Sequence, residues 1–163
     1  MKIINAGVTA PKGFKCAGLR AGVKSGKTNK DMAMIVSEVP AKIAGTFTKN
    51  IVKAAPVLWG KKIVEEQEAV RAVVINTGIA NACTGAQGYE NVVTEAKEVA
   101  KLLDIKPEEV VVGSTGVIGQ QLPMDVIKEG IKKLVPELKQ TDKVKKMHPG
   151  LSLQPIQNQK KRQ

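Results

Sequence analysis

Runs of apolar residues in the middle of the chain have the length and composition of β-strands. Asp31–Glu38, ended by Pro40, and Arg71–Asn76 are compact runs rich in Ala, Val, Ile or Met, and Glu109–Val112 is a third run dominated by valine. Short runs of this kind, bounded by polar residues, Gly or Pro, are typical of strands. The sequence therefore predicts three strands at these places.

The region between the first two runs is less regular. Ile43–Thr48 predicts a further strand that pairs with the first one. Lys53–Trp59 contains a proline and predicts another extended segment. Lys61–Glu68 is short and charged, and its composition is compatible with a helix.

Two later segments have the period of amphipathic helices. Between Gly88 and Asp104, apolar residues recur at spacings of three and four, namely Val92, Val93, Ala96, Val99, Ala100 and Leu103. A second helix begins at Pro123–Asp125, where proline suits the first turn, and Pro136 closes its pattern. From residue 71 to residue 136 the order is strand, loop, helix, strand, loop, helix. That order predicts an α/β fold.

Each of the two later strands leads into a polar, glycine-rich stretch. Gly113–Gly119 combines three glycines with two hydroxyls, so its backbone N–H groups could hold a phosphate or the oxyanion of an acyl-transfer intermediate. The alternative is a tight turn without chemistry. In the earlier stretch, Asn76, Asn81 and Thr84 could hydrogen-bond a substrate or only their own backbone. Because the two stretches follow successive buried strands, we expect them to face one site.

The composition narrows the chemistry. With 163 residues there is room for one ordinary domain, and only four residues are aromatic, so the core must be aliphatic. Cys16 and Cys83 are too few and too far apart for a disulfide framework or a metal knuckle, and both are expected to be small buried side chains. His148 is the only histidine and lies near the C-terminus, which leaves no histidine base in residues 1–142. No metal or cofactor is expected.

The positive charge is concentrated at one end. Of the 26 basic residues, six fall from Lys143 onward, where no acidic residue occurs, and the formal net charge is +11. We therefore divide the chain into residues 1–142 and a basic tail of residues 143–163, which is expected to be disordered. A basic protein that binds nucleic acid or an acidic partner is one alternative, but aromatic platforms are lacking. No membrane span or secretion signal is recognisable, which favours the cytosol.

Four separated motifs resemble those of one enzyme family. Residues 3–142 resemble the N-terminal portion of the ornithine acetyltransferase/N-acetylglutamate synthase family of arginine biosynthesis. The matching stretches are Gly7–Phe14, Lys53–Leu58, Ala80–Gly88, and Ser114–Gly119 followed by Leu122-Pro123-Met124. The resemblance implies mixed sheets with covering helices, in a layered α/β sandwich of the autoprocessing N-terminal-nucleophile type that is incomplete in this chain.

The resemblance also implies a reaction. Family members cleave themselves between Ala and Thr, and the new N-terminal Thr of the β chain moves acetyl from N-acetylornithine to glutamate; some members also use acetyl-coenzyme A. Such a Thr can use its own α-amino group as the base. Thr115 and Gly116 match the oxyanion-hole pair of the family. The implied partners are a β chain, in αβ heterodimers that assemble further, and small-molecule substrates.

Two departures from the family pattern bear on activity. Ile79 stands where family members usually have Asn, and no Ala-Thr pair occurs in the chain, so the nucleophile is missing. An inactive truncated remnant is therefore a second alternative. Residues 147–157 can be encoded by bases that, read in a shifted frame, give Ala-Ser-Arg-Ala-Ile-Ile-Thr-Thr-Asp-Thr, which fits a family motif. We therefore interpret the tail as the product of a frame shift near residues 143–146.

Overall fold

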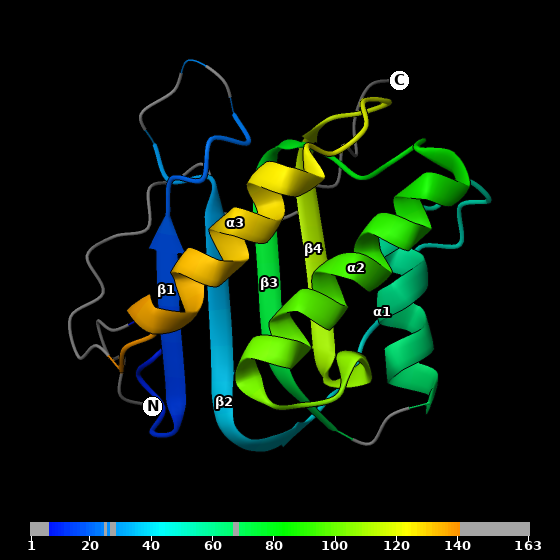
Figure 1. Cartoon of the computed structure of the whole chain (residues 1–163). Coiled ribbons are helices and arrows are strands. Elements are labelled where there is room, and N and C mark those ends of the chain that lie inside the picture. The colour runs from blue at the N-terminus through cyan, green and yellow to red at the C-terminus, as the bar shows by residue number, and fades with distance from the viewer. Residues whose placement is uncertain (1–6, 25, 27–28, 67–68, 141–163) are drawn as a thin grey trace, which may run out of the picture.

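Four strands form one mixed sheet in the computed structural model, which describes residues 7–24, 26, 29–66 and 69–140. The strands are β1 (Phe14–Leu19), β2 (Met32–Lys42), β3 (Ala69–Ile79) and β4 (Val110–Val117). Their order across the sheet is their order along the chain (Figure 1). The pairs β1–β2 and β2–β3 are antiparallel, and β3–β4 is parallel. The expected α/β class with a mixed sheet and covering helices is confirmed.

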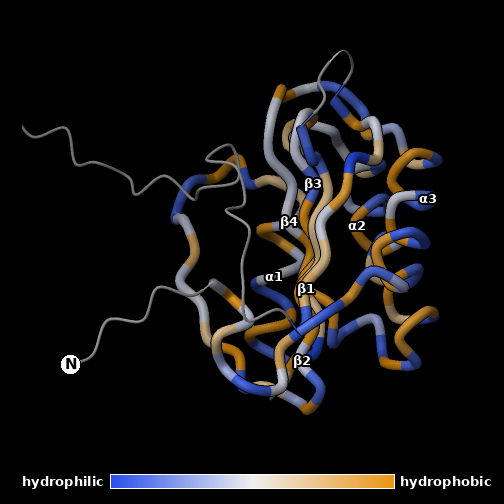
Figure 2. Tube along the Cα trace, turned by 90° about the vertical axis from the view of Figure 1, so that its left-hand side faces the viewer, coloured by the Kyte–Doolittle hydropathy of each residue, from blue (hydrophilic) through white to orange (hydrophobic). Residues whose placement is uncertain are grey.

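Three α-helices pack against this sheet. They are α1 (Ala55–Glu66), α2 (Gly85–Leu103) and α3 (Met124–Leu134), with short 3-10 turns η1 (Pro107–Glu109) and η2 (Val135–Glu137). Figures 1 and 2 show α2 and α3 on the same face of the sheet, while α1 packs against α2 and β4 at the sheet edge. The helix α2 connects the parallel strands β3 and β4, as parallel pairing requires.

Alternate strand residues meet different surroundings. On the face beneath α2 and α3, β2 contributes Met32 and Met34, β3 contributes Val74, and β4 contributes Val110 and Val112, all of them buried. On the opposite face Ala33 is buried, but the larger apolar side chains are only half-buried: Ile35, Val73, Ile75 and Val111. The hydrophobic core thus lies between the sheet and the two helices (Figure 2).

The two long helices form where the periodicity predicts them. Val92, Ala96 and Val99 of α2 are fully buried, because positions three and four apart share one helix face. The helix ends at Asp104, whose left-handed φ of +54° turns the chain out of the helix. In α3, Gly130 faces β2, and a Cβ there would collide with the Met32 sulfur. That contact lets α3 lie close to the sheet.

Two predictions about residues 43–59 are wrong. Ile43–Thr48 is not a strand, and Lys53–Trp59 is not extended, since α1 begins at Ala55. Proline at the first turn of a helix costs no hydrogen bond, and Ala55, Trp59 and Ile63 recur every four residues on its buried side. The Trp59 indole N–H then donates to the Val110 carbonyl at 2.8 Å, which fixes α1 against β4.

Proline does not end β2. The strand continues through Pro40 to Lys42, with an irregular register between Val36 and Ala41. A bulge is one of the few places in a sheet where the missing proline N–H is tolerated. The prediction of two buried cysteines also fails, because Cys83 is exposed while Cys16 is half-buried. The tail of residues 143–163, with His148, lies outside the described residues.

Candidate functional site

The carboxyl ends of β3 and β4 lie side by side. Their parallel register pairs Asn76 with Ser114, Thr77 with Thr115, and Gly78 with Gly116. The expected loops at residues 76–79 and 113–117 are therefore strand, because each satisfies the backbone groups of the other. In open α/β sheets, ligands bind beyond the carboxyl ends of parallel strands. The two polar stretches that the sequence singles out do meet at this end of the sheet (Figure 1).

Two threonines meet at the end of this parallel pair. The Thr115 hydroxyl donates to the Thr77 hydroxyl, with 3.2 Å between the oxygens, and Thr115 is exposed. In the alternation of the strands, these two residues share the face of Val73 and Val111, away from α2 and α3. The site therefore presents hydroxyl groups on the uncovered face of the sheet.

Gly116 permits the close approach of the two strand ends. Its φ is +132°, and a Cβ at this position would overlap the Gly78 carbonyl and lie 2.7 Å from the Ile79 nitrogen. A side chain at residue 116 would push β4 away from β3. The absence of a side chain at Gly116 thus allows the backbone next to Thr115 to lie directly against β3.

Asn76 and Ser114 belong to the covered face. The Asn76 amide Nδ2 donates to the Ile79 carbonyl at 2.9 Å, and the Ser114 hydroxyl donates to the same carbonyl at 3.1 Å. The Asn81 main-chain N–H donates to Ser114 Oγ at 3.0 Å. These bonds hold the chain that leaves β3 against the end of β4. Asn76 is completely buried.

Asn81 and Thr84 connect this corner to the start of α2. The Asn81 amide Nδ2 donates to the Gly88 carbonyl at 2.8 Å, and the Thr84 hydroxyl donates to Asn81 Oδ1 at 2.6 Å. Both side chains are buried. A Cβ at Gly88 would overlap the Thr84 hydroxyl and lie 2.6 Å from Asn81 Oδ1, which explains why glycine stands there.

Asp31 is a site-forming residue that sequence reasoning missed. Its buried carboxylate accepts the main-chain N–H groups of Ala21, Gly22 and Lys24 at 2.6, 3.0 and 3.1 Å. Its main-chain carbonyl accepts the Thr77 N–H at 2.8 Å. The signal was available, since an aspartate that ends a glycine-rich loop often bonds the backbone of that loop. Asp31 thereby fixes the loop before β2 against the end of β3.

Glu95 is the second residue that was missed. It lies on α2, is completely buried, and burial raises its pKa from 4.5 to about 8. Neither of its carboxyl oxygens has a hydrogen-bond partner among the described residues, and the same holds for Asn76 Oδ1. Its place within the buried stripe between Val92 and Val99 is the signal that sequence reasoning could have used.

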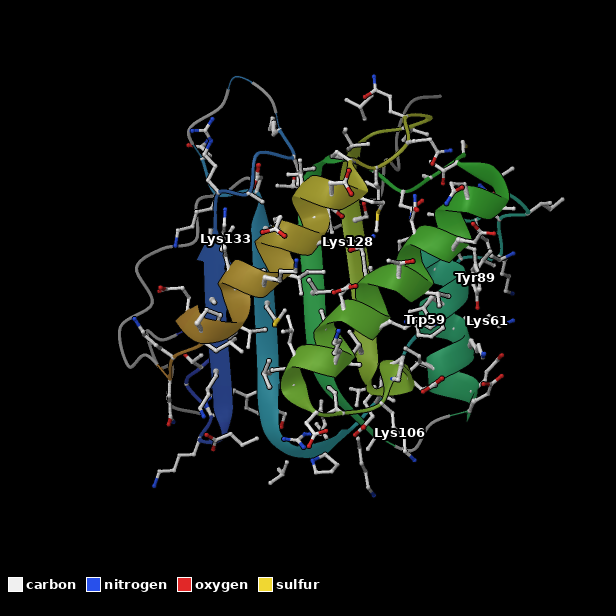
Figure 3. All side chains as sticks on the ribbon, in the orientation of Figure 1. Trp59, Lys61, Tyr89, Lys106, Lys128 and Lys133 are labelled. Carbon is white, nitrogen blue, oxygen red and sulfur yellow. The ribbon has the colours of Figure 1, made fainter. Side chains whose placement is uncertain are left out.

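The rest of the described surface offers few other sites. No group of three His, Cys, Asp or Glu residues that could hold a metal ion occurs in the part of the chain that the structure describes. Figure 3 shows Lys61, Lys106, Lys128 and Lys133 spread over one face, and these residues do not gather into a stripe. Within the described residues, no helix is long and apolar enough to cross a membrane.

Comparisons with known proteins agree with one another. The ArgJ family model matches residues 15–150. The chain is 48% identical over 135 residues to the arginine biosynthesis bifunctional protein ArgJ of Streptococcus mutans, covering 83% of this chain and 34% of the relative. It is 47% identical over 137 residues to the chloroplastic ArgJ protein of Citrullus lanatus, covering 84% of this chain and 30% of that protein.

Two solved structures have the same fold. The ArgJ protein of Bacillus halodurans superposes with a TM-score of 0.80 at 40% identity, covering 86% of this chain and 72% of that one. The ornithine acetyltransferase of Mycobacterium tuberculosis, solved in complex with ornithine, gives 0.81 at 41% identity, covering 86% and 75%. The chain spans about a third of the length of the curated relatives that it matches. It belongs to the ArgJ family.

Proposed function

We propose that this chain is the N-terminal portion of a glutamate N-acetyltransferase of arginine biosynthesis. In this proposal the complete enzyme transfers acetyl from N-acetylornithine to glutamate, and acetyl-coenzyme A is a further candidate donor. The names of the relatives support the pathway and the chemistry. The observation that carries the proposal is the exposed Thr115 hydroxyl beside Gly116, at the carboxyl ends of two parallel strands.

The proposed role of Thr115 and Gly116 is to form an oxyanion hole. A nucleophilic Thr would attack the acetyl carbonyl, ornithine would leave, and the glutamate amine would then attack the acetyl-enzyme. Each step passes through a tetrahedral intermediate whose oxygen carries negative charge. A preorganised hydroxyl and backbone N–H stabilise that charge, and losing one such donor typically costs about 10²–10³ in turnover. An N-terminal Thr supplies its own amine as base, so the mechanism needs no histidine.

The nucleophile must come from a second polypeptide or from chain beyond residue 163. We propose a β chain that packs against the uncovered face of the sheet, where the apolar side chains Ile35, Val73, Ile75 and Val111 are only half-buried. Val117 and Ile118, next to the threonine pair, are 54% and 63% exposed. Large apolar groups gathered near a site often mark a protein interface. The proposed location of the enzyme is the cytosol.

We propose an indirect role in substrate binding for Asn76, Asn81 and Thr84, which support the backbone of the site from the covered side of the sheet. Their side chains bond the Ile79 and Gly88 carbonyls and each other, so they hold the strand ends that carry Thr77 and Thr115. The departure at Ile79 is compatible with this role. The group used at residue 79 is its main-chain carbonyl, which any residue supplies.

An acetyl-transfer assay tests the proposal. The chain is assayed alone and after co-expression with the C-terminal part of a close ArgJ relative, using N-acetylornithine and glutamate. We expect no transfer by the chain alone, self-association of the isolated chain in light scattering, and transfer by the complex. Transfer by the chain alone, or a well-formed complex without transfer, would contradict the proposal. The second outcome would favour an inactive remnant.

Sequencing the gene tests the origin of the tail. We propose that residues 143–163 follow a one-base slip and that the original reading frame continues through Thr-Thr-Asp-Thr to an Ala-Thr cleavage point. Codons that cannot yield this motif in the shifted frame, or a downstream region without Ala-Thr, would exclude the slip. The result is independent of the assay above.

A further inference from the structure

The buried layer between α2 and the sheet contains two polar side chains with unused hydrogen-bonding atoms. Asn76 and Glu95 are both 0% exposed. The unpartnered buried side-chain atoms in the described part of the chain are Asn76 Oδ1 and the two carboxyl oxygens of Glu95. A buried polar atom without a partner costs roughly 1–3 kcal/mol, so such atoms in a native protein call for an explanation.

Several contacts place Asn76 at the end of the sheet where α2 begins. Asn76 pairs with Ser114, and Ser114 Oγ accepts the Asn81 N–H, whose own side chain reaches the Gly88 carbonyl in the first turns of α2. From Gly88, α2 runs back over the sheet, and Glu95 follows about two turns later. Side chains on a helix point toward its N-terminus, which directs the Glu95 carboxyl toward the end of the sheet that carries Asn76. Figure 1 shows α2 crossing in front of β3 and β4.

The two groups are chemically complementary in one protonation state. An ionised carboxylate only accepts hydrogen bonds, and so does an amide oxygen, whereas a protonated carboxyl has one O–H to donate. We propose that Glu95 is a neutral carboxylic acid in the folded protein and donates its proton in a hydrogen bond to Asn76 Oδ1. This bond uses the free acceptor on Asn76 and removes a charge from the core.

The bond makes Glu95 a positioning residue for the site. With Oδ1 held by Glu95, the amide of Asn76 is oriented so that Nδ2 faces the Ile79 carbonyl, to which it donates. The same carbonyl receives the Ser114 hydroxyl. Asn76 and Ser114 directly precede Thr77 and Thr115 in their strands. This hydrogen-bond network therefore helps to fix the positions of the two threonine hydroxyls. This inference holds whatever reaction the site performs.

Burial, without help from any neighbouring charge, keeps the Glu95 carboxyl neutral. Burial is the cause of the raised pKa of Glu95, and no charged neighbour contributes to it. The following ionisable residues lie on α2 or on the elements packed against it, and none of them contributes to the pKa shift of Glu95: Lys61, Lys62, Glu65 and Glu66 of α1; Tyr89, Glu90, Lys97, Glu98 and Lys101 of α2; Glu108 and Glu109 of η1; and Asp125, Lys128, Glu129, Lys132 and Lys133 of α3.

A carbon-13 and nitrogen-15 NMR titration of the full chain tests the bond. We expect the Glu95 carboxyl to titrate near pH 8 and the Asn76 side-chain amide signals to shift with the same midpoint. The amide of Thr115 should follow them. A Glu95 midpoint near 4.5, or Asn76 signals that ignore the Glu95 titration, would overturn the proposal.

Substitutions give a second test at pH 6. Glu95→Gln keeps a donor for Asn76, while Glu95→Met has similar length and no donor. We expect Glu95→Met to lower the folding equilibrium constant at least about tenfold relative to Glu95→Gln, and this gap to close in an Asn76→Leu background. Glu90→Gln on the same helix is the matched control and should change little. A gap that persists without Asn76 would contradict the bond; should Glu95→Met not fold, the wild-type titration decides.

Discussion

On the face of the sheet covered by α2 and α3, Asn76 is buried, Ser114 is partly buried, and both side chains donate to the Ile79 carbonyl. One residue further along the same strands, on the uncovered face, Thr77 and Thr115 bond each other, and Thr115 is exposed. The difference follows from the two-residue period of a strand, which sends neighbours to opposite faces. The covered side chains hold main-chain groups in place, and the uncovered side chains present hydroxyl groups at the candidate site.

Ionisation of Glu95, on the covered side of the sheet, should destabilise the fold more than any other change considered below. In the unfolded chain Glu95 ionises with the ordinary glutamate pKa of 4.5, whereas in the folded chain burial raises that pKa to about 8. Since the folded pKa is higher, the contribution of Glu95 to stability is fully present below pH 4.5 and is lost as the pH rises to 8. A shift of this size corresponds to about 5 kcal/mol, which is a large part of the usual stability of a domain.

Denaturant unfolding measured from pH 5 to pH 9 checks this expectation. Stability should fall steadily toward pH 8 and then level off, and Glu95→Gln should remove most of the fall. Glu90→Gln, with an exposed side chain on the same helix, should leave the fall unchanged. A wild-type profile that is flat in this range would contradict a buried neutral Glu95.

A side chain at Gly116 should have the next largest effect. Gly116→Ala forces a Cβ into the Gly78 carbonyl at a φ of +132°, so we expect a loss of about 3 kcal/mol or more and separation of the two strand ends. Gly119→Ala is the matched control, because its φ is +85° but no atom lies within 4 Å of the added Cβ. That control should lose about 1 kcal/mol. Equal losses in thermal unfolding would show that the close approach is not what requires glycine.

The neighbouring hydroxyls of Ser114 and Thr115 should affect different properties, stability and turnover respectively. In the reconstituted complex, Thr115→Ala should lower turnover about a hundredfold or more, with little change in KM or stability. Ser114→Ala removes a donor to the Ile79 carbonyl and an acceptor for the Asn81 N–H, so it should cost about 1–3 kcal/mol of stability. Steady-state kinetics and unfolding of both variants check the contrast. Unchanged turnover in Thr115→Ala would remove its hydroxyl from the mechanism, although a backbone N–H would survive the substitution.

The sequence predicts the helical half of the fold better than the sheet. Helices α2 and α3 repeat their apolar residues with one period on one face, so pattern alone locates them. In β3, Val73, Val74 and Ile75 are consecutive apolar residues, and no alternation shows which side faces the helices. The wrong assignment at residues 53–59 has a local cause, since proline suits both an extended segment and a helix start.

The candidate site was predicted in part. Thr115 and Gly116 stand out because of the glycine-rich motif, but their partners Thr77 and Gly78 become visible only through the register of β3 and β4. That register depends on pairing between residues 38 positions apart, which no local pattern encodes. Polarity alone marks Asn76, Asn81 and Thr84 in the sequence as candidates, and the structure shows that their side chains are buried.

The smallest expected effect compares neighbouring valines of β3. Val74 is fully buried beneath the helices, so Val74→Ala should cost about 2 kcal/mol in the isolated chain. Val73 is half-buried on the uncovered face, and Val73→Ala should cost less than about 1 kcal/mol there. If a β chain covers that face, the cost of Val73→Ala should rise toward that of Val74→Ala in the complex. Unfolding with and without the C-terminal part measures both; a Val73→Ala cost that stays the same would place the partner elsewhere.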